Sequence, residues 1–370
     1  MYLSYWEYKT WFDNVDFAVI GSGIVGLNCA ITLRKNHPKS KIVVLEKGFL
    51  PAGASTKNAG FACFGSLSEI IDDLKNHPEE QVLSLIKNRY SGLQLLRKNL
   101  GDKAIGYKNY GGYELFLEEH QSLFEECLSE IKTINTFLNP IFKEPVFKPK
   151  KGPFRFKNTM QHVIFNPFEA QIDTGKMMQA LIKLAQNKNI TILNGVEVSS
   201  FSENNHSVDI HINNNIVIKT KKLYIANNGF AAKLLDVDVK PARAQVLITK
   251  PIKNLKVKGI FHFDQGYYYF RNIDNRVLFG GGRNLNFKKE ETTQVGTTPQ
   301  VQDRLEELLK TTILPGIPIE IDKRWSGTMG MGTQKTPIVK QLSQNVYCAV
   351  RLGGMGVAMG SNIGKELALL

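Results

Sequence analysis

Residues 15–26 read Val-Asp-Phe-Ala-Val-Ile-Gly-Ser-Gly-Ile-Val-Gly, and this stretch decides the fold of the 370-residue chain. An apolar run ends in a Gly-x-Gly-x-x-Gly turn, and a helix-like segment follows it. A second apolar run, Lys41-Ile-Val-Val-Leu-Glu46, then closes on an acidic residue. This order predicts a strand, a tight turn, a helix and a second strand parallel to the first.

Each glycine of the turn has its own physical reason. Gly21 allows the sharp turn, Gly23 leaves room for a pyrophosphate beside the backbone, and Gly26 lets the helix pack closely on the sheet. The start of the helix offers free N–H groups to phosphates. Glu46 follows at the position from which a carboxylate accepts hydrogen bonds from ribose hydroxyls. The segment therefore predicts a dinucleotide-binding protein, with redox chemistry as its expected use.

The composition is typical of a soluble globular protein, with 42% hydrophobic and 22% charged residues. No apolar run approaches the roughly 20 residues that cross a bilayer, and residues 1–14 lack an apolar signal core. A cytoplasmic location is expected, and peripheral membrane association stays open. The net charge of +13 is interpreted as a generally basic surface, with nucleic-acid or membrane contact as the alternative.

The cysteines and histidines give no sign of a metal site. Cys29, Cys63, Cys127 and Cys348 are scattered, and the seven histidines show no HxH or HExxH pattern. The sequence therefore predicts neither a disulfide framework nor a bound metal.

The order of strand-like and helix-like segments predicts two discontinuous domains. Residues 14–76, 168–243 and 335–370 are assigned to the nucleotide-binding domain, and residues 77–167 and 244–334 to a substrate domain inserted in two pieces. Residues 138–167 are rich in Pro, Phe and Lys and look irregular.

Three stretches together resemble the D-amino-acid oxidase (DAO) superfamily of FAD-dependent oxidoreductases, which includes glycine oxidase, sarcosine oxidase and DadA-type dehydrogenases. They are the Gly21–Gly26 turn with Glu46, the segment Gly53-Ala-Ser-Thr-Lys-Asn-Ala-Gly60, and the segment Arg351-Leu-Gly-Gly-Met-Gly-Val-Ala358. The resemblance covers nearly the whole chain. It implies an α/β fold (α+β overall), in which a Rossmann-like FAD-binding domain carries an inserted substrate domain of antiparallel β-sheet and helices.

The resemblance also implies which residues contact FAD. Around the first turn these are Gly21, Ser22, Gly23, Ile24, Val25, Gly26, Glu46 and Lys47. The next group is Ala54, Ser55, Thr56, Lys57, Asn58, Ala59, Gly60 and Phe61. Further along the chain they are Val198, Asn227, Gly327, Arg351, Gly353, Gly354, Met355, Gly356 and Val357. Relatives that hold FAD covalently have a cysteine in the region of Trp325–Met331, where this chain has none. Non-covalent FAD is therefore expected, and Cys63 is interpreted as a packing residue.

Members of the superfamily oxidise a C–N bond and pass a hydride to flavin N5. Amino-acid oxidases fix the substrate carboxylate with an arginine close after a Trp-x-Gly motif, but here methionines follow Trp325-Ser-Gly327. The substitute cations are Arg271, Arg283 and Arg351. Strand alternation puts Tyr269 and Arg271 on one face. Tyr269, Arg271 and Arg351 are therefore the predicted catalytic residues.

The predicted activity is FAD-dependent oxidation of a small amine or amino acid, with oxygen or a quinone as electron acceptor. One alternative is an FAD oxidoreductase acting on a tRNA wobble-uridine modification, like the FAD-containing half of MnmC-type enzymes, which the +13 charge would suit. A second alternative is a flavin-binding protein without turnover, which the missing arginine permits. The sequence does not indicate which amine is oxidised.

Overall fold

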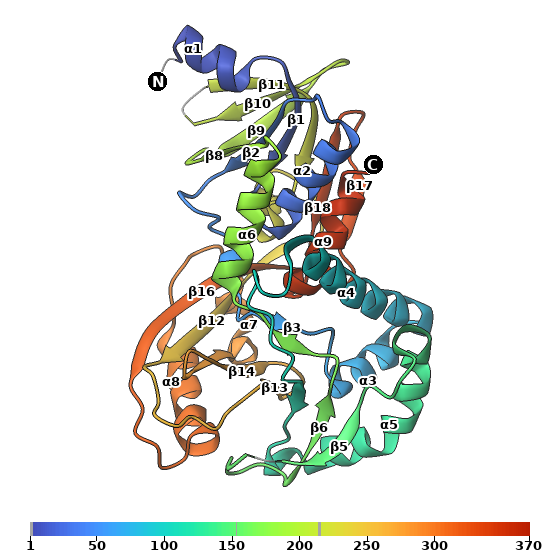
Figure 1. Cartoon of the computed structure of the whole chain (residues 1–370), viewed down its shortest axis with the longest axis vertical. Coiled ribbons are helices and arrows are strands. Elements are labelled where there is room, and N and C mark those ends of the chain that lie inside the picture. Colours follow the sequence, from blue (N-terminus) through green and yellow to red (C-terminus); the bar gives the residue numbers. More distant parts are fainter. Residues whose placement is uncertain (1–2, 153, 214–215) are drawn as a thin grey trace.

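The computed structural model describes residues 3–152, 154–213 and 216–370. Within them, two eight-stranded sheets form the body of the molecule, one in the upper half of Figure 1 and one in the lower half. The upper sheet has the order β17-β18-β11-β1-β2-β8, and β10 and β9 continue from β11. Its strands are β1 (Val15–Ile20), β2 (Ile42–Glu46), β8 (Thr191–Asn194), β9 (Val198–Glu203), β10 (Val208–Ile212), β11 (Ile216–Ile225), β17 (Ile338–Gln341) and β18 (Val346–Val350).

The centre of the upper sheet is parallel, as the first 46 residues predict. Strand β1 pairs in parallel with both β2 and β11, while β8 and β18 extend the parallel run on either side. Three helices pack on one face: α2 (Ile24–Asn36), α6 (Thr174–Asn187) and α9 (Gly356–Leu367). The β9–β10 pair contributes to the core on the other face. Burial on both faces explains why β1 and β2 read as continuous apolar runs.

The lower sheet has the order β16-β12-β15-β14-β13-β4-β6-β5 and is antiparallel except at the β13–β4 pair. Its strands are β4 (Gly112–Glu114), β5 (Lys148–Lys151), β6 (His162–Asn166), β12 (Lys240–Thr249), β13 (Ile260–Phe263), β14 (Tyr268–Ile273), β15 (Arg276–Gly281) and β16 (Ile321–Met331). Helices α3 (Leu67–Asn76), α5 (Gln121–Phe142) and α8 (Pro299–Leu308) pack around it (Figure 1). The predicted fold class is confirmed, while the exact domain boundaries stay a prediction.

One part of the lower sheet was expected to be irregular. Strands β5 and β6 pair within residues 138–167, with Lys148 opposite Phe165. All four residues of β5 are exposed at the edge of the sheet. An edge strand that buries no side chain has no apolar alternation, so its sequence carries no strand signal.

Short contacts tie the two sheets together. Strand β3 (Phe61–Ala62) pairs with β7 (Ala170–Gln171), and Gln171 donates its side-chain N–H to the carbonyl of Asn272 in the lower sheet. The indole Nε1 of Trp325, on β16, donates to the carbonyl of Lys57 at 2.9 Å. Residues 54–61, which are expected to contact FAD, are thus fastened to the lower sheet, and the bond from the N–H of Ile24 to the Ser55 hydroxyl fastens them to α2.

Helices α2 and α9 pack closely because glycines face the contact. A Cβ added at Gly364 would lie 2.4 Å from the carbonyl oxygen of Val25, and one added at Gly360 would lie 2.8 Å from the side chain of Ile24. On the other side of α9, helix α4 (Glu79–Leu100) approaches through Gly92, where a Cβ would lie 2.4 Å from the carbonyl oxygen of Ala358. Among the described residues, no helix is long and apolar enough to cross a membrane.

We expect Gly364→Ala to push the second half of α9 away from the start of α2. The new methyl group would meet backbone rather than a flexible side chain, so the overpacking should cost about 1–3 kcal/mol. Thermal unfolding and the flavin content per chain would measure the effect. Gly175→Ala is the matched control, because there the added Cβ meets one side-chain atom at an ordinary 3.4 Å. Equal stability of the two variants would contradict the role given to this contact.

Candidate active site

A cavity of about 370 Å³ lies where the upper and lower sheets meet. One wall consists of the starts of α2 and α9, from Gly23 to Val25 and from Met355 to Ala358. Another wall comes from the lower sheet and includes Val246 and Tyr269. Neither N-cap residue, Gly23 or Met355, caps its helix with a side chain, and both helices direct their positive ends toward the same space.

The glycine turn has the geometry that its sequence predicts. Gly21 has a φ of +100°, and a Cβ at Gly26 would lie 1.9 Å from the carbonyl oxygen of Gly21. A Cβ at Gly23 would lie 2.8 Å from the hydroxyl of Ser55. That hydroxyl accepts a hydrogen bond from the backbone N–H of Ile24 at 3.0 Å. Backbone and ligand can therefore approach closely at the start of α2.

Glu46 is buried at the end of β2, 7% exposed. Its Oε2 accepts from the backbone N–H and the hydroxyl of Ser22 at 3.1 and 2.8 Å, and its Oε1 accepts from the N–H groups of Gly48 and Ala52. These four bonds hold the carboxylate against the glycine turn. Its predicted contact with a ribose stays a prediction.

The loop before α9 depends on one asparagine and one strained arginine. The side-chain oxygen of Asn228 accepts from the N–H groups of Arg351 and Leu352 at 3.1 and 3.2 Å. Arg351 has a φ of +66°, which is unfavourable for a side-chain-bearing residue. Its guanidinium donates to the carbonyl of Thr336 and, at 2.6 Å, to the carboxylate of Asp238. Hydrogen bonds from Thr333, together with Arg351, hold the pKa of Asp238 below its ordinary value.

The segment from residue 54 to residue 61 is held by its own side chains. Asn58 donates to the carbonyls of Ala54 and Ser55, and its oxygen accepts from the N–H of Gly60 and the hydroxyl of Thr174. With its ends fixed, this segment presents a defined surface to the cavity. Several of its residues belong to the lining.

The structure brings most of the residues expected to bind FAD to this cavity. Those in the lining are Gly23, Ile24, Val25, Ala54, Ser55, Lys57, Asn58, Ala59, Phe61, Gly327, Gly353, Gly354, Met355, Gly356 and Val357. Those outside it are Gly21, Ser22, Gly26, Glu46, Lys47, Thr56, Gly60, Val198, Asn227 and Arg351. Among the latter, Lys47 pairs with Glu197 at the surface.

The three predicted catalytic residues separate in space. Tyr269 lines the cavity, and burial raises the pKa of its hydroxyl to about 12. Arg271, on the same face of β14, is 1% exposed and donates to the carbonyls of Gly60 and Ile172 at 2.9 and 2.5 Å. Burial lowers the pKa of Arg271 to about 10. Of the described residues, the lining includes Tyr269 and leaves out Arg271 and Arg351.

Arg283 is the substitute arginine that the structure brings to the cavity wall. It follows Gly282, whose φ is +74°, and its guanidinium lies over the ring of Phe287 at 4.7 Å. No ion pair joins Arg283 to any acidic residue that the structure describes. Burial lowers the pKa of Arg283, yet an arginine stays charged throughout the physiological range. The cavity therefore contains a cation that is available to an anion.

Several lining residues gave no signal in the sequence. These are Glu69, Asn228, His262, Gln265 and Lys335. They are isolated polar residues from separate elements, and no local motif marks them. Cys63 also lines the cavity. Burial, reinforced by the nearby Glu169 carboxylate, raises the pKa of the Cys63 thiol.

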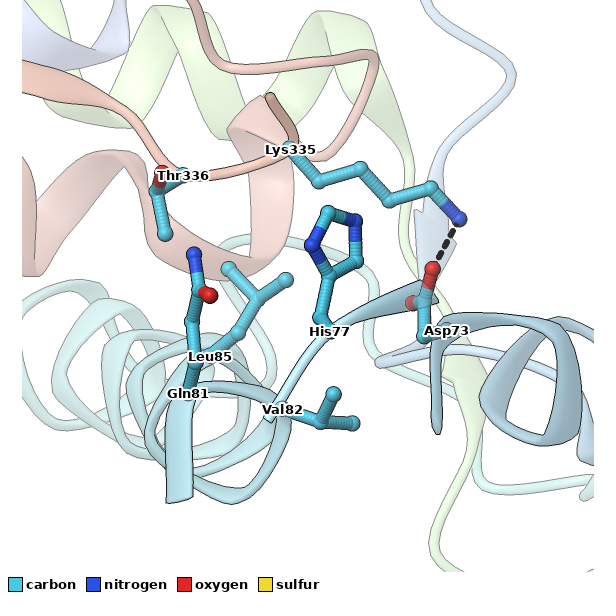
Figure 2. Close-up of a pocket in the computed structure, with 7 residues that line it drawn as sticks. All are labelled: Asp73, His77, Gln81, Val82, Leu85, Lys335 and Thr336. Carbon is cyan, nitrogen blue, oxygen red and sulfur yellow. Dashed lines mark ion pairs between the residues drawn. The ribbon is translucent and has the colours of Figure 1, made fainter. Parts of the chain in front are cut away.

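A second, much smaller pocket has a volume of about 10 Å³. It lies between α3, the start of α4 and residues 335–336 (Figure 2). Lys335 reaches across it and pairs with Asp73 at 2.5 Å. The Asp73 side chain is 5% exposed, against 45% for Lys335. The pocket has room for little more than a water molecule. The ion pair between Lys335 and Asp73 therefore has a structural role, because it anchors the loop that contains Lys335.

The chain belongs to the DAO family, described as FAD dependent oxidoreductase, whose sequence profile matches residues 16–370. It is 21% identical to the probable oxidoreductase OrdL of Haemophilus influenzae over 97% of this chain and 83% of that protein. In structure it is similar to glycine oxidase from Geobacillus kaustophilus, with a TM-score of 0.73, 18% identity and coverage of 94% and 92%. L-proline dehydrogenase from P. horikoshii gives a TM-score of 0.71, 18% identity and coverage of 96% and 92%.

The site fits the cofactor that the family name gives. The positive φ values of Gly353 and Gly354, at +55° and +83°, bring the backbone of the last loop to the cavity, where side-chain-bearing residues would be strained. The side-chain oxygen of Asn227 is buried and, among the described residues, without a hydrogen-bond partner. A buried acceptor of this kind requires a donor, and Asn227 lies between Ala226 and Asn228, which both line the cavity.

We expect Lys335→Met to destabilise the protein by about 1–2 kcal/mol, because it leaves the buried Asp73 carboxylate without its partner. Denaturant unfolding would measure the loss. Lys250→Met is the control, since Lys250 and Glu320 form an exposed pair whose side chains are 57% and 72% accessible. A loss no larger than that of the control would show that the Asp73 contact does not anchor the loop.

Proposed function

We propose that this FAD-dependent oxidoreductase oxidises a C–N bond of a small amine or amino acid, with FAD held non-covalently. The observation that carries the proposal is the cavity itself. Two helix starts and a glycine loop form its proposed cofactor wall, and its lining includes Tyr269 and Arg283, which has no ion pair among the described residues. Bound FAD would supply the hydride acceptor. The protein residues would bind the substrate, orient it and exclude water.

Arg283 is proposed as the group that binds a substrate carboxylate. A guanidinium matches a carboxylate with two parallel hydrogen bonds. The position after Trp325-Ser-Gly327 is filled by Met329, whose sulfur would lie 3.1 Å from a Cβ at Gly354. Met329, which packs against the glycine loop, thus occupies the position at which amino-acid oxidases have their arginine. In this chain the positive charge comes instead from Arg283, which follows β15.

Tyr269 is proposed to orient the substrate as a neutral hydrogen-bonding group. Its ring lies over Gly280, where a Cβ would come within 2.6 Å of it, and it meets Phe61 edge to face at 5.6 Å. Because its pKa is raised to about 12, the hydroxyl stays protonated in any ordinary assay. We therefore expect no step in a pH–rate profile between pH 6 and 10 from Tyr269.

Anaerobic reduction of the bound flavin tests the proposed function. Amino acids, N-methyl amino acids and amines would be added one class at a time, and the band near roughly 450 nm would be followed. Bleaching by one class identifies the substrate, and admission of air separates an oxidase from a dehydrogenase. Acid precipitation should leave the yellow colour in the supernatant if FAD is non-covalent. A yellow protein bleached by none of them, but binding modified tRNA in a salt-sensitive way, would favour the tRNA alternative.

For the acidic substrate found in that screen, we expect Arg283→Met to raise KM by about 10–100-fold with a smaller change in kcat. A hydrogen bond to a charged group contributes about 1.5–3 kcal/mol, which corresponds to that range. Steady-state kinetics would measure it, and Arg283→Lys should recover part of the loss. Arg304→Met, which removes a half-buried cation that is paired with Glu307 and lies outside the cavity lining, is the control. An unchanged KM in Arg283→Met would contradict the assignment.

A further inference from the structure

Three buried side chains from distant parts of the chain meet at the wall of the large cavity. Cys63 follows β3, Glu169 precedes β7, and His262 lies on β13. One potential ligand atom from each of them lies within 4.8 Å of the other two. Their exposed fractions are 7%, 2% and 7%, and Cys63 and His262 line the cavity. No other described group of at least three such side chains meets this criterion.

The spacing within this cluster does not correspond to an ordinary hydrogen bond. Nε2 of His262 lies 3.4 Å from Oε2 of Glu169, and among the described residues Nε2 has no hydrogen-bond partner. A charged N–H···O bond would be about 2.7–2.9 Å long. In a tetrahedral zinc site, whose bonds to nitrogen and oxygen are about 2.0–2.2 Å, neighbouring ligand atoms lie about 3.3–3.5 Å apart. The observed distance therefore matches one edge of a coordination tetrahedron.

The negative charge of Glu169 also favours a bound cation at this cluster. Among the described residues, its other oxygen accepts one long hydrogen bond, 3.3 Å, from the N–H of Phe64. The nearby Arg89 donates to the carbonyl of Phe64 and forms no ion pair with Glu169 in the described structure. A buried carboxylate is costly unless a cation compensates it, and among the described residues the one ion-pair partner of Glu169 is His262 itself. A divalent cation with one thiolate, one carboxylate and one neutral imidazole gives a site of zero net charge.

We propose that Cys63, Glu169 and His262 bind a divalent metal ion of the zinc class at the wall of the flavin cavity. Sulfur, nitrogen and carboxylate oxygen are the donors that Zn²⁺ takes in proteins, and three protein ligands with one open position are typical of its catalytic sites. Because Cys63 and His262 line the cavity, the open position faces it. Water, or the amine or carboxylate of the substrate class proposed above, would be the fourth ligand.

Metal analysis of the purified holoprotein tests this site without any activity measurement. We expect about one equivalent of zinc per chain by mass spectrometry after purification without chelators. After chelation, Co²⁺ should restore occupancy and give the thiolate-to-cobalt charge-transfer band of a cysteine-bound ion. Cys63→Ser and His262→Gln should weaken Zn²⁺ binding by at least about 100-fold, the upper range for loss of groups that only support a ligand. Flavin content and thermal unfolding would show that these variants fold.

Cys127→Ser is the matched control, because Cys127 is an equally buried free cysteine that belongs to a different part of the core. It should retain both metal and cobalt band. If His262→Gln does not fold, Cys63→Ser and Glu169→Gln decide the question. A metal-free protein whose Zn²⁺ affinity equals that of Cys63→Ser would overturn the proposal and leave a His262–Glu169 ion pair. Flavin reduction by an amine in a protein that binds Zn²⁺ no more tightly than Cys63→Ser would overturn this site alone, whereas a metal-bound protein that no substrate reduces would contradict the proposed function alone.

Discussion

The close contact between α2 and α9 is the constraint on which the candidate site depends. These helices come from opposite ends of the sequence, and each begins at the cavity. Gly360 and Gly364, in the middle and the second half of α9, let this helix lie directly against the start of α2 at Ile24 and Val25. Two positive helix ends that meet in this way repel each other unless an anion lies between them. The packing therefore stores an unfavourable interaction that a bound dinucleotide would relieve.

The wall of the cavity that is proposed to bind the substrate depends on a second constraint, which joins the lower sheet to residues 57–60, the segment expected to contact the cofactor. Trp325 holds the carbonyl of Lys57, and Arg271 holds the carbonyl of Gly60. Both donors lie on strands of the lower sheet, so the substrate wall and the cofactor segment are fixed relative to each other. This explains why Arg271 is fully buried, since its guanidinium donates hydrogen bonds to the backbone carbonyls of two separate segments.

The upper sheet could be predicted from the sequence because its signals are local. The turn from Gly21 to Gly26 and the acidic residue Glu46 lie within 26 residues, and their order specifies the strand pairing. The substrate wall could not be predicted in the same way. Tyr269 and Arg271 share a strand face, as alternation predicts, but only one of them reaches the cavity. The difference lies in Gly280, which leaves space for one ring, and in the carbonyls that surround the arginine.

The cluster of Cys63, Glu169 and His262 shows most clearly that contacts between distant segments leave no local signal in the sequence. The sequence predicts no metal site because ligand spacing is read along the chain, and these residues are 106 and 93 positions apart. Their meeting requires the β3–β7 pair, which brings Cys63 and Glu169 together, and the Phe61–His262 contact, 5.1 Å between ring centroids, which brings β13 to that pair. Three ligands that converge only through tertiary structure would form a site whose metal affinity depends on folding. Such a metal ion would in turn stabilise the junction between the two sheets, where the cavity lies.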